Sequence, residues 1–147
     1  VIASGKILSG FHILRAMALG ADGCNSARAM MMALGCIQAL LCNTNRCPTG
    51  ITTQDPQLTV GLVVEDKKHR VANYHEDTVK SFVELLGAAG LEDMKQLTRS
   101  HIYRRVFMNE VRTFEDVFPS LQPGCLLNGN IPEKYKQDIE AASADRW

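Results

Sequence analysis

The sequence has no excess of charge of one sign. Its sixteen basic and sixteen acidic residues give a formal net charge of zero, and they alternate along the chain instead of clustering. A protein that binds nucleic acid or an anionic membrane surface through electrostatics carries a basic patch or stripe. The charge pattern therefore predicts no nucleic-acid partner.

Long apolar runs are missing as well. The longest apolar stretch, residues 29–42, is interrupted by Gly35 and Gln38. It falls short of the roughly 20 residues that a transmembrane helix needs. The first residues also lack the basic region, apolar segment and cleavage site of a secretory signal. We expect no membrane-spanning segment and, by default, a cytoplasmic location.

The first residue is Val1 and not methionine. Because an apolar, strand-like segment begins at once, we expect the chain to start within a fold. A longer parent protein would then have room for a targeting or anchoring segment outside this sequence.

Two strand–helix units are predicted in the first forty residues. A short apolar strand, 1–3, ends in a glycine turn, and a helix with an apolar stripe runs from residue 10 to about Gly20. A second strand, 21–25, leads into a helix over about 27–39, for which Ser26 is the expected N-cap. Alternating strands and helices are typical of α/β proteins.

The pattern then changes to a loop and a helical tail. Asn, Thr, Gly and Pro dominate residues 42–61, which favours a loop ordered by something other than an apolar core. A long helix follows, with apolar residues from Val71 to Ala89 at three- and four-residue spacings and Gly90 as its stop. Short helical turns and a final charged helix over about 132–144 complete the chain.

Three of the five cysteines carry the clearest chemical signal. Cys36, Cys42 and Cys47 follow a C-x5-C-x4-C spacing across a helix end and a polar loop. A single cysteine is most often a buried apolar residue, but a core seldom places several cysteines in a polar loop. Ligation of a metal centre is therefore the favoured interpretation.

The residues alone leave several kinds of site open. Zinc sites favour shorter spacings and a fourth Cys or His, and His12 and His69 are distant in sequence. A disulfide plus one free thiol requires an oxidising compartment, which nothing in the sequence indicates. Iron–sulfur ligation fits better, as a three-iron cluster or as a cluster with a distant fourth ligand, for which Cys24 is a candidate.

A second candidate site lies where the two predicted strands end. In a (β/α)8 barrel, the turns after the last two strands present backbone amides and a helix N-terminus to a phosphate. Turns of small residues are also common without a ligand, so the spacing leaves both interpretations open. The candidate residues are Ser4, Gly5 and Lys6 after the first strand, and Asn25, Ser26, Ala27 and Arg28 after the second.

One long segment of the sequence resembles the FMN-binding domain of the glutamate synthase family, including its stand-alone members. The segment is ALGADGCNSARAMMMALGCIQALLCNTNRCPTGITTQDPQL. It covers the cysteine spacing and the CPTG and TQDP motifs. Residues 65–106 are similar to the helical segment that follows in the family, and the ending NGNIPEKYKQDIEAASADRW is similar to the tails of stand-alone members.

The resemblance implies an α/β fold, the C-terminal fragment of a TIM-type (β/α)8 barrel with about its last two strand–helix units. Residues 1–41 are then the end of the FMN-binding barrel, 42–61 the cluster loop and 62–147 a helical C-terminal extension. A complete barrel needs eight strands, and the sequence predicts about two. We therefore expect a fragment.

The resemblance also implies two cofactors, FMN and a [3Fe-4S] cluster. Cys36, Cys42 and Cys47 match the cluster ligands of the family. Ser4, Gly5 and Lys6, together with Asn25, Ser26, Ala27 and Arg28, match its FMN-phosphate turns. The second turn reads CNSAR here, whereas the large synthases have more glycine in it.

The implied reaction is the reduction of 2-iminoglutarate, formed from 2-oxoglutarate and ammonia, to L-glutamate. The ammonia is free or derived from glutamine, and the electrons come from ferredoxin or a pyridine-nucleotide-dependent subunit. The family's substrate-binding residues lie mostly upstream, so we name no catalytic residue and expect this chain alone to be inactive. The alternatives are an electron-transfer or metal-stabilised interaction module, and a related FMN oxidoreductase with another substrate.

Overall fold

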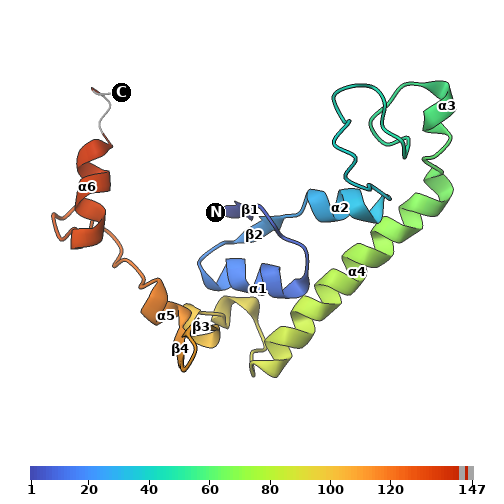
Figure 1. Cartoon of the computed structure of the whole chain (residues 1–147). Coiled ribbons are helices and arrows are strands. Elements are labelled where there is room, and N and C mark those ends of the chain that lie inside the picture. The colour runs from blue at the N-terminus through green and yellow to red at the C-terminus, as the bar shows by residue number, and fades with distance from the viewer. Residues whose placement is uncertain (143–144, 146–147) are drawn as a thin grey trace.

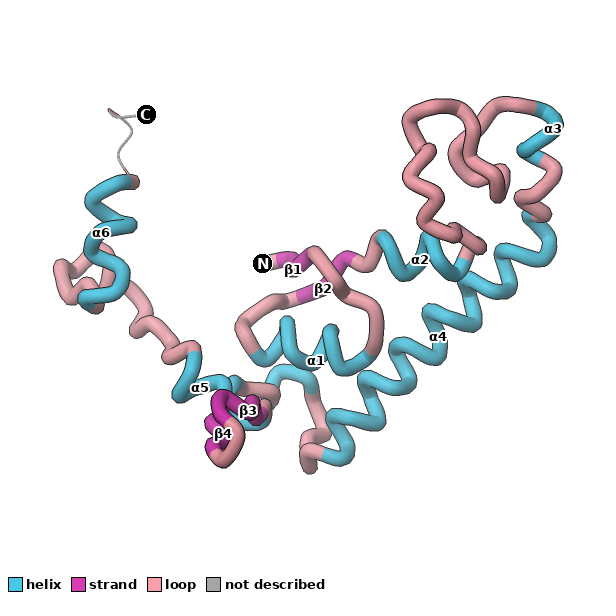
Figure 2. Tube along the Cα trace, in the orientation of Figure 1, coloured by secondary structure: helices cyan, strands magenta, loops and turns pink. Residues whose placement is uncertain are grey.

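A computed structural model of the protein describes residues 1–142 and 145. Figure 1 shows an open arrangement in which one long helix, α4, runs along a small β–α–β–α unit, and the C-terminal segment extends away from it. Figure 2 shows how much of the chain is loop. The elements are β1 Ile2–Ser4, α1 Gly10–Ala18, β2 Gly23–Asn25, α2 Arg28–Ala33, α3 Pro56–Thr59, α4 Val64–Ala88, the 3-10 helices η1 Met94–Gln96 and η2 Arg99–His101, β3 Tyr103–Phe107, β4 Glu110–Thr113, α5 Phe114–Val117 and α6 Glu133–Ala141.

The first two strands form a parallel pair joined by α1. Ile2 lies opposite Gly23, and Ser4 lies opposite Asn25. Parallel strands need a crossover connection, which α1 provides. The two strand–helix units predicted from the sequence are confirmed. Whether they belong to a (β/α)8 barrel stays a prediction, because β1 and β2 are the only strands of their sheet within residues 1–142 and 145.

The second helix is shorter than predicted. α2 ends at Ala33, whereas the apolar run suggested a helix to about residue 39. Gly35 adopts a φ of 105°, and the amides of Gly35 and Cys36 donate to the carbonyl oxygens of Met32 and Met31. A residue in this left-handed region closes a helix because the next residues can no longer continue the hydrogen-bond ladder.

The expected N-cap of α2 was also wrong. Ala27 occupies the N-cap position, and no side chain caps the helix. The Ser26 hydroxyl donates instead to the Ile7 carbonyl oxygen at 2.7 Å. Ser26 therefore ties the turn after β2 to the segment after β1.

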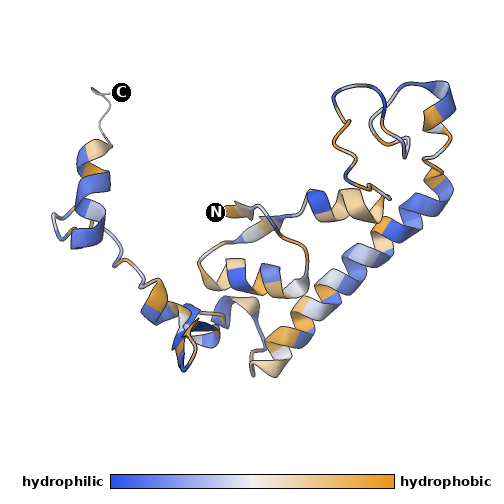
Figure 3. Cartoon of the chain, viewed as in Figure 1, coloured by the Kyte–Doolittle hydropathy of each residue, from blue (hydrophilic) through white to orange (hydrophobic). Residues whose placement is uncertain are grey.

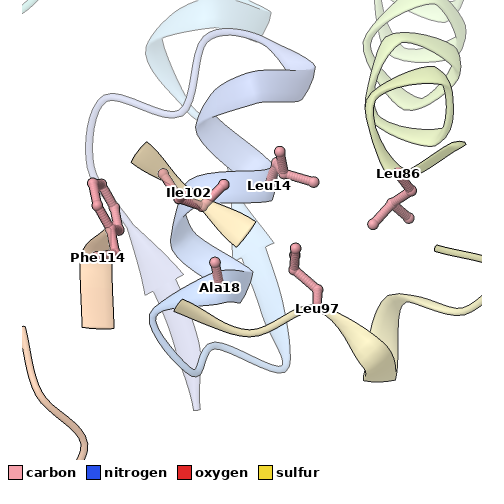
Figure 4. Packing of buried hydrophobic residues seen from close by; sticks show 6 residues of the cluster. All are labelled: Leu14, Ala18, Leu86, Leu97, Ile102 and Phe114. Carbon is pink, nitrogen blue, oxygen red and sulfur yellow. The ribbon is translucent and has the colours of Figure 1, made fainter. Parts of the chain in front are cut away.

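The apolar core lies between α1, the end of α4 and the segment that follows α4. Its buried residues, drawn in Figure 4, are Leu14, Ala18, Leu86, Leu97, Ile102 and Phe114. α1 approaches α4 closely at Gly10, where an added Cβ would lie 2.5 Å from the Phe82 nitrogen. Gly90, with a φ of 74°, ends α4 as the sequence predicted.

The C-terminal part is not purely helical. The short helical turns after Leu91 are confirmed as η1 and η2, but β3 and β4 then form an antiparallel hairpin where a helical extension was predicted over 62–147. Tyr103 to Phe107 contains only aromatic, β-branched and arginine residues, a composition that suits a strand. The final helix is confirmed over 133–141, and the predicted residues 143 and 144 lie outside the described part.

Much apolar surface is left uncovered. A compact monomer of 16.2 kDa has an accessible surface of about 7,500 Å², whereas this chain exposes 10,965 Å². Val1 and Ile2, at the start of the first strand, are 84% and 69% exposed, and Leu40 and Phe107 are also largely exposed. Figure 3 shows how apolar residues are distributed along the chain. No helix among the described residues is long and apolar enough to cross a membrane.

Candidate cofactor site at the cysteine loop

The loop between α2 and α4 is held by polar contacts and not by an apolar core. Asn45 is at its centre with a φ of 60°. The Thr53 hydroxyl donates to the Asn45 carbonyl oxygen at 2.6 Å, and the Gln54 amide donates to the Asn45 side-chain oxygen at 2.7 Å. These bonds fold the second half of the loop back onto the first.

Short helix α3 fixes the return of the loop to α4. The Asp55 carboxylate accepts a hydrogen bond from the Gln57 amide at 2.9 Å, and Pro56 occupies the first turn. Gly50 packs against this helix so closely that an added Cβ would lie 2.4 Å from the Leu58 carbonyl oxygen. The TQDP motif therefore begins a helix, and the glycine of CPTG allows the loop to pack against it.

Cys47 is the most enclosed of the three predicted ligands. The residue is 9% exposed, and its sulfur lies 3.3 Å from the Thr49 hydroxyl oxygen. Hydrogen bonding from the Thr49 hydroxyl, and then from the backbone amides of Thr52 and Thr49, lowers the pKa of the Cys47 thiol to about 6. A lowered pKa favours the thiolate, which is the form that ligates metals.

One hydroxyl beside Cys47 has unused hydrogen-bonding capacity. The Thr52 hydroxyl oxygen is buried and has no hydrogen-bond partner of normal geometry among the described residues. A buried hydroxyl without a partner costs free energy. A group with sulfur acceptors bound next to Cys47 would supply the missing acceptor.

Cys36 and Cys42 are more accessible. Cys36 is half-buried at the start of the loop, and its sulfur accepts a hydrogen bond from the Gln38 amide at 3.4 Å. Cys42 is exposed and lines a cavity of about 400 Å³. The other lining residues of this cavity are mostly polar: Asn43, Asn45, Ile51, Thr52, Thr53 and Gln54.

The three cysteines are not assembled into a ligand set. Within residues 1–142 and 145, no three His, Cys, Asp or Glu side chains form a group able to hold a metal ion. The donor chemistry fits an iron–sulfur cluster, with three thiols, a depressed pKa and an unpaired hydroxyl, but the cage geometry is not preformed. Cys36, Cys42 and Cys47 therefore stay a predicted ligand set.

The structure also bears on the disulfide and on the fourth ligand that the sequence left open. All five cysteines are free thiols. Cys24, the candidate fourth ligand, lies on β2, and burial raises the pKa of its thiol. A raised pKa disfavours the thiolate, so this position is less suited to ligation than Cys47.

The two predicted phosphate turns lie side by side. Because β1 and β2 are parallel and Ser4 pairs with Asn25, both strands end at the same edge. Ser4, Gly5 and Lys6 are exposed there. Gly5 and Lys6 have φ angles of 96° and 56°, so the chain turns sharply as it leaves β1.

In the second turn, the candidates differ in what they can offer. Asn25, Ala27 and Arg28 are exposed, whereas Ser26 is half-buried. The Ser26 hydroxyl donates its proton to Ile7, so a phosphate here would meet the backbone of Ser26. The structure brings both turns together, and their role in binding FMN stays a prediction.

The sequence matches a known protein family. Residues 1–92 match the family described as a conserved region in glutamate synthase. The chain belongs to the glutamate synthase family. The matched region contains both predicted phosphate turns, the cysteine loop and all of α4, and the resemblance seen in the sequence is confirmed.

Curated relatives extend the match to single proteins. The chain is 45% identical over 105 residues to the glutamate synthase large subunit-like protein YerD of Bacillus subtilis (strain 168), which covers 71% of the chain and 20% of that relative. It is 41% identical over 97 residues to an archaeal glutamate synthase [NADPH] of Methanocaldococcus jannaschii, covering 66% of the chain and 19% of the relative. It thus spans about a fifth of the length of these glutamate synthases.

A third relative includes the C-terminal tail. The glutamate synthase [NADH] of Saccharomyces cerevisiae is 26% identical over 142 residues, which is 94% of this chain and 6% of that protein. No solved structure matches the chain.

Sequence reasoning missed part of what surrounds the cysteines in this glutamate synthase segment. Thr49 is the threonine of the CPTG motif, and its position two residues after Cys47 already places its hydroxyl near the sulfur. Thr52 and Gln54 were not named, because their proximity to Cys47 and Asn45 depends on the loop folding back on itself. A run of hydroxyl residues after CPTG was the available signal.

Proposed function

We propose that the chain is part of an oxidoreductase that reduces 2-iminoglutarate, formed from 2-oxoglutarate and ammonia, to L-glutamate with FMN and a [3Fe-4S] cluster. The observation that carries the proposal is the cysteine loop within the matched family region, in which hydroxyl and amide donors surround Cys47 and lower its pKa. A thiolate that is stable at neutral pH is suited to hold iron.

Three cysteines of the loop would hold the cluster. Cys36 and Cys42 are accessible at the start of the loop, and Cys47 is the enclosed ligand. The unpaired Thr52 hydroxyl would donate to sulfur, and such hydrogen bonds tune the reduction potential of a cluster. When bound, the cluster supplies single-electron transfer and the FMN supplies hydride transfer.

The parallel β1–β2 pair would hold the flavin phosphate. Two strands linked by a helix, with their turns at one edge, are the repeating unit of a TIM-type barrel. In that architecture the exposed Gly5 and Lys6 turn and the neighbouring Asn25–Arg28 turn would face the phosphate. The exposed Val1 and Ile2 at the start of β1 suit a strand that lies within a larger sheet.

The names of the relatives favour one electron source. Those from Methanocaldococcus jannaschii and Saccharomyces cerevisiae are named as NADPH- and NADH-dependent glutamate synthases. We propose that electrons reach this protein from a pyridine-nucleotide-dependent partner, with ferredoxin as the other source to test, and that the protein is cytoplasmic. The ammonia is free or derived from glutamine.

Anaerobic purification of the full-length protein tests the proposal. We expect flavin absorbance together with a broad iron–sulfur shoulder, and glutamate formation from 2-oxoglutarate, ammonia and a reductant. Cys47→Ser should remove the shoulder, while Cys125→Ser, which changes a cysteine outside the loop, should leave it. A shoulder without flavin would instead support an electron-transfer module, and a preparation with zinc alone would reject both. Both cofactors without glutamate formation would point to a related FMN oxidoreductase with another substrate.

A further inference from the structure

A second cavity lies away from the cysteine loop, on the other side of the β1–β2 pair. It has a volume of about 520 Å³ and is bounded by α1, the start of β3 and α5. Figure 1 shows these elements together below β1 and β2, away from the loop between α2 and α4. A cavity of this size is in the range of small-molecule sites.

The inner wall of this cavity is aromatic and apolar. Ile102 and Phe114 belong to the core and lie against α1, as Figure 4 shows. Phe118 packs edge-to-face on Phe114 with ring centroids 5.4 Å apart, and Phe11 lines the wall from α1. Such a surface binds a planar ring by stacking and apolar contact.

Two arginines line the same cavity. Arg15 lies in the last turn of α1. Arg104 lies two residues after the buried Ile102 in extended chain, so both side chains face the α1 side of the strand. No acidic residue lines the cavity. The lining therefore combines a ring-binding surface with two positive charges.

These two arginines are unpaired, unlike their neighbours. Neither Arg15 nor Arg104 makes an ion pair or a side-chain hydrogen bond within residues 1–142 and 145. By contrast, Arg99 donates to the carbonyl oxygens of Leu19 and Phe118, and Arg112 pairs with Glu110. A guanidinium with free donors can bind a phosphate or carboxylate in a bidentate manner.

We propose that this cavity binds a small anionic ligand with a planar ring, in which Arg15 and Arg104 hold the anionic group and the aromatic wall holds the ring. The anionic group is a phosphate ester, as in a nucleoside monophosphate, or a carboxylate, as in an arylacetic acid. Two features of one ligand are recognised together, so neither the ring nor the anion alone should bind well.

Calorimetric titration of the full-length protein tests this site. The probes are adenosine monophosphate and indole-3-acetate, with adenosine as the ring without charge and inorganic phosphate as the charge without ring. Titrations are made with protein loaded with FMN and freed of unbound FMN, which keeps the proposed flavin turns occupied and leaves no free FMN to compete for this cavity. We expect one of the two probes to bind with one-to-one stoichiometry, and which one it is identifies the anionic group.

Arginine variants assign the binding to this cavity. Arg15→Gln and Arg104→Gln should each weaken binding at least about tenfold, and Arg15→Lys less so, because lysine keeps the charge but loses the bidentate geometry. The control is Arg70→Gln, which removes an exposed arginine of α4 that does not line the cavity. Circular dichroism checks that each variant is folded. Failure of both probes at millimolar concentration, or binding unchanged in both arginine variants, would overturn the proposal.

Discussion

The α1–α4 core and the cysteine loop are built on opposite principles. The core is held by buried apolar side chains such as Leu14 and Leu86, whereas the loop is held by hydrogen bonds around Asn45 and Cys47. Apolar burial is non-directional, while a hydrogen-bonded loop fixes the direction of each donor. The difference suggests that the core provides stability and the loop provides oriented donors for a polar ligand.

The largest expected effect is in the core. Leu14→Ala removes buried apolar atoms between α1 and α4 and should lower the free energy of unfolding by about 2–5 kcal/mol. Chemical denaturation followed by circular dichroism measures it. Val83→Ala on the exposed side of α4 is the control, with a change within about 0.5 kcal/mol. Equal losses for the two variants would contradict the assignment of the core.

The contact between α1 and α4 gives the next largest effect. Gly10→Ala places a Cβ against the α4 backbone and should cost about 1–3 kcal/mol by overpacking. Gly87→Ala is the matched control, because no atom lies near its added Cβ and alanine favours a helix by about 1 kcal/mol. The two alanine substitutions should therefore change the midpoint of denaturation in opposite directions.

In the loop, Asn45 should matter locally and not globally. Asn45→Ala removes the acceptor of the Gln54 amide and should lower local stability by about 1–2 kcal/mol, seen as faster hydrogen exchange of that amide. Asn45→Gly allows the positive φ at this position without strain but still lacks the acceptor, so hydrogen exchange of the Gln54 amide should stay fast. Asn43→Ala, which has no such bond, should leave the exchange rate unchanged. Unfolding of the whole protein in Asn45→Ala would contradict the proposed difference between the α1–α4 core and the cysteine loop.

Substitution of Thr49 should have the smallest effect on stability. Its effect should instead be seen in the pKa of one thiol, that of Cys47. In metal-free protein, Thr49→Val removes the hydroxyl that contributes most to the low pKa of Cys47, so this pKa should rise above about 6. The measurement is the thiolate absorbance that disappears in Cys47→Ser. Thr44→Val, whose hydroxyl bonds to Leu41 instead, is the control. An unchanged titration would remove Thr49 from the site.

The same pKa shift predicts how stability depends on pH. The folded-state pKa of Cys47 lies below its ordinary value of 9.0. Its contribution to stability is therefore complete above pH 9, decreases as the pH falls from about 9 to about 6, and is absent below that. Thr49→Val should narrow the pH range over which the free energy of unfolding depends on Cys47. Unfolding at a series of pH values measures this range.

Local signals in the sequence predicted the elements that depend on local physics. The apolar stripe of α1 and the stop at Gly90 are confirmed because each depends on neighbours in the chain. The length of α2 was wrong because the apolar run to residue 39 outweighed Gly35, whose left-handed backbone ends the helix. The β3–β4 hairpin was missed because Arg104 and Arg105 obscure the alternation of a strand.

For the candidate site, the sequence reached the residues but not their arrangement. The spacing of Cys36, Cys42 and Cys47 and the family resemblance were visible, and membership of the family is confirmed. The low pKa of Cys47 and the unpaired Thr52 hydroxyl depend on a fold-back that brings residues 49–54 onto 45–47. Spacing cannot predict such contacts, because they are set by backbone geometry at Asn45 and Gly50.

The position of the cysteine loop has a consequence for engineering. It leaves α2 and re-enters α4 at neighbouring points. A Cβ added at Gly35 would lie 3.8 Å from the Lys67 side chain, and Met30 and Leu34 line one cavity with Leu62 and Val64. Closing a long excursion between neighbouring anchors costs chain entropy that grows only slowly with its length. The segment 36–61 is therefore suited to transplantation: loops of other lengths from related synthases can be grafted between the two anchors without rebuilding the helices beneath them.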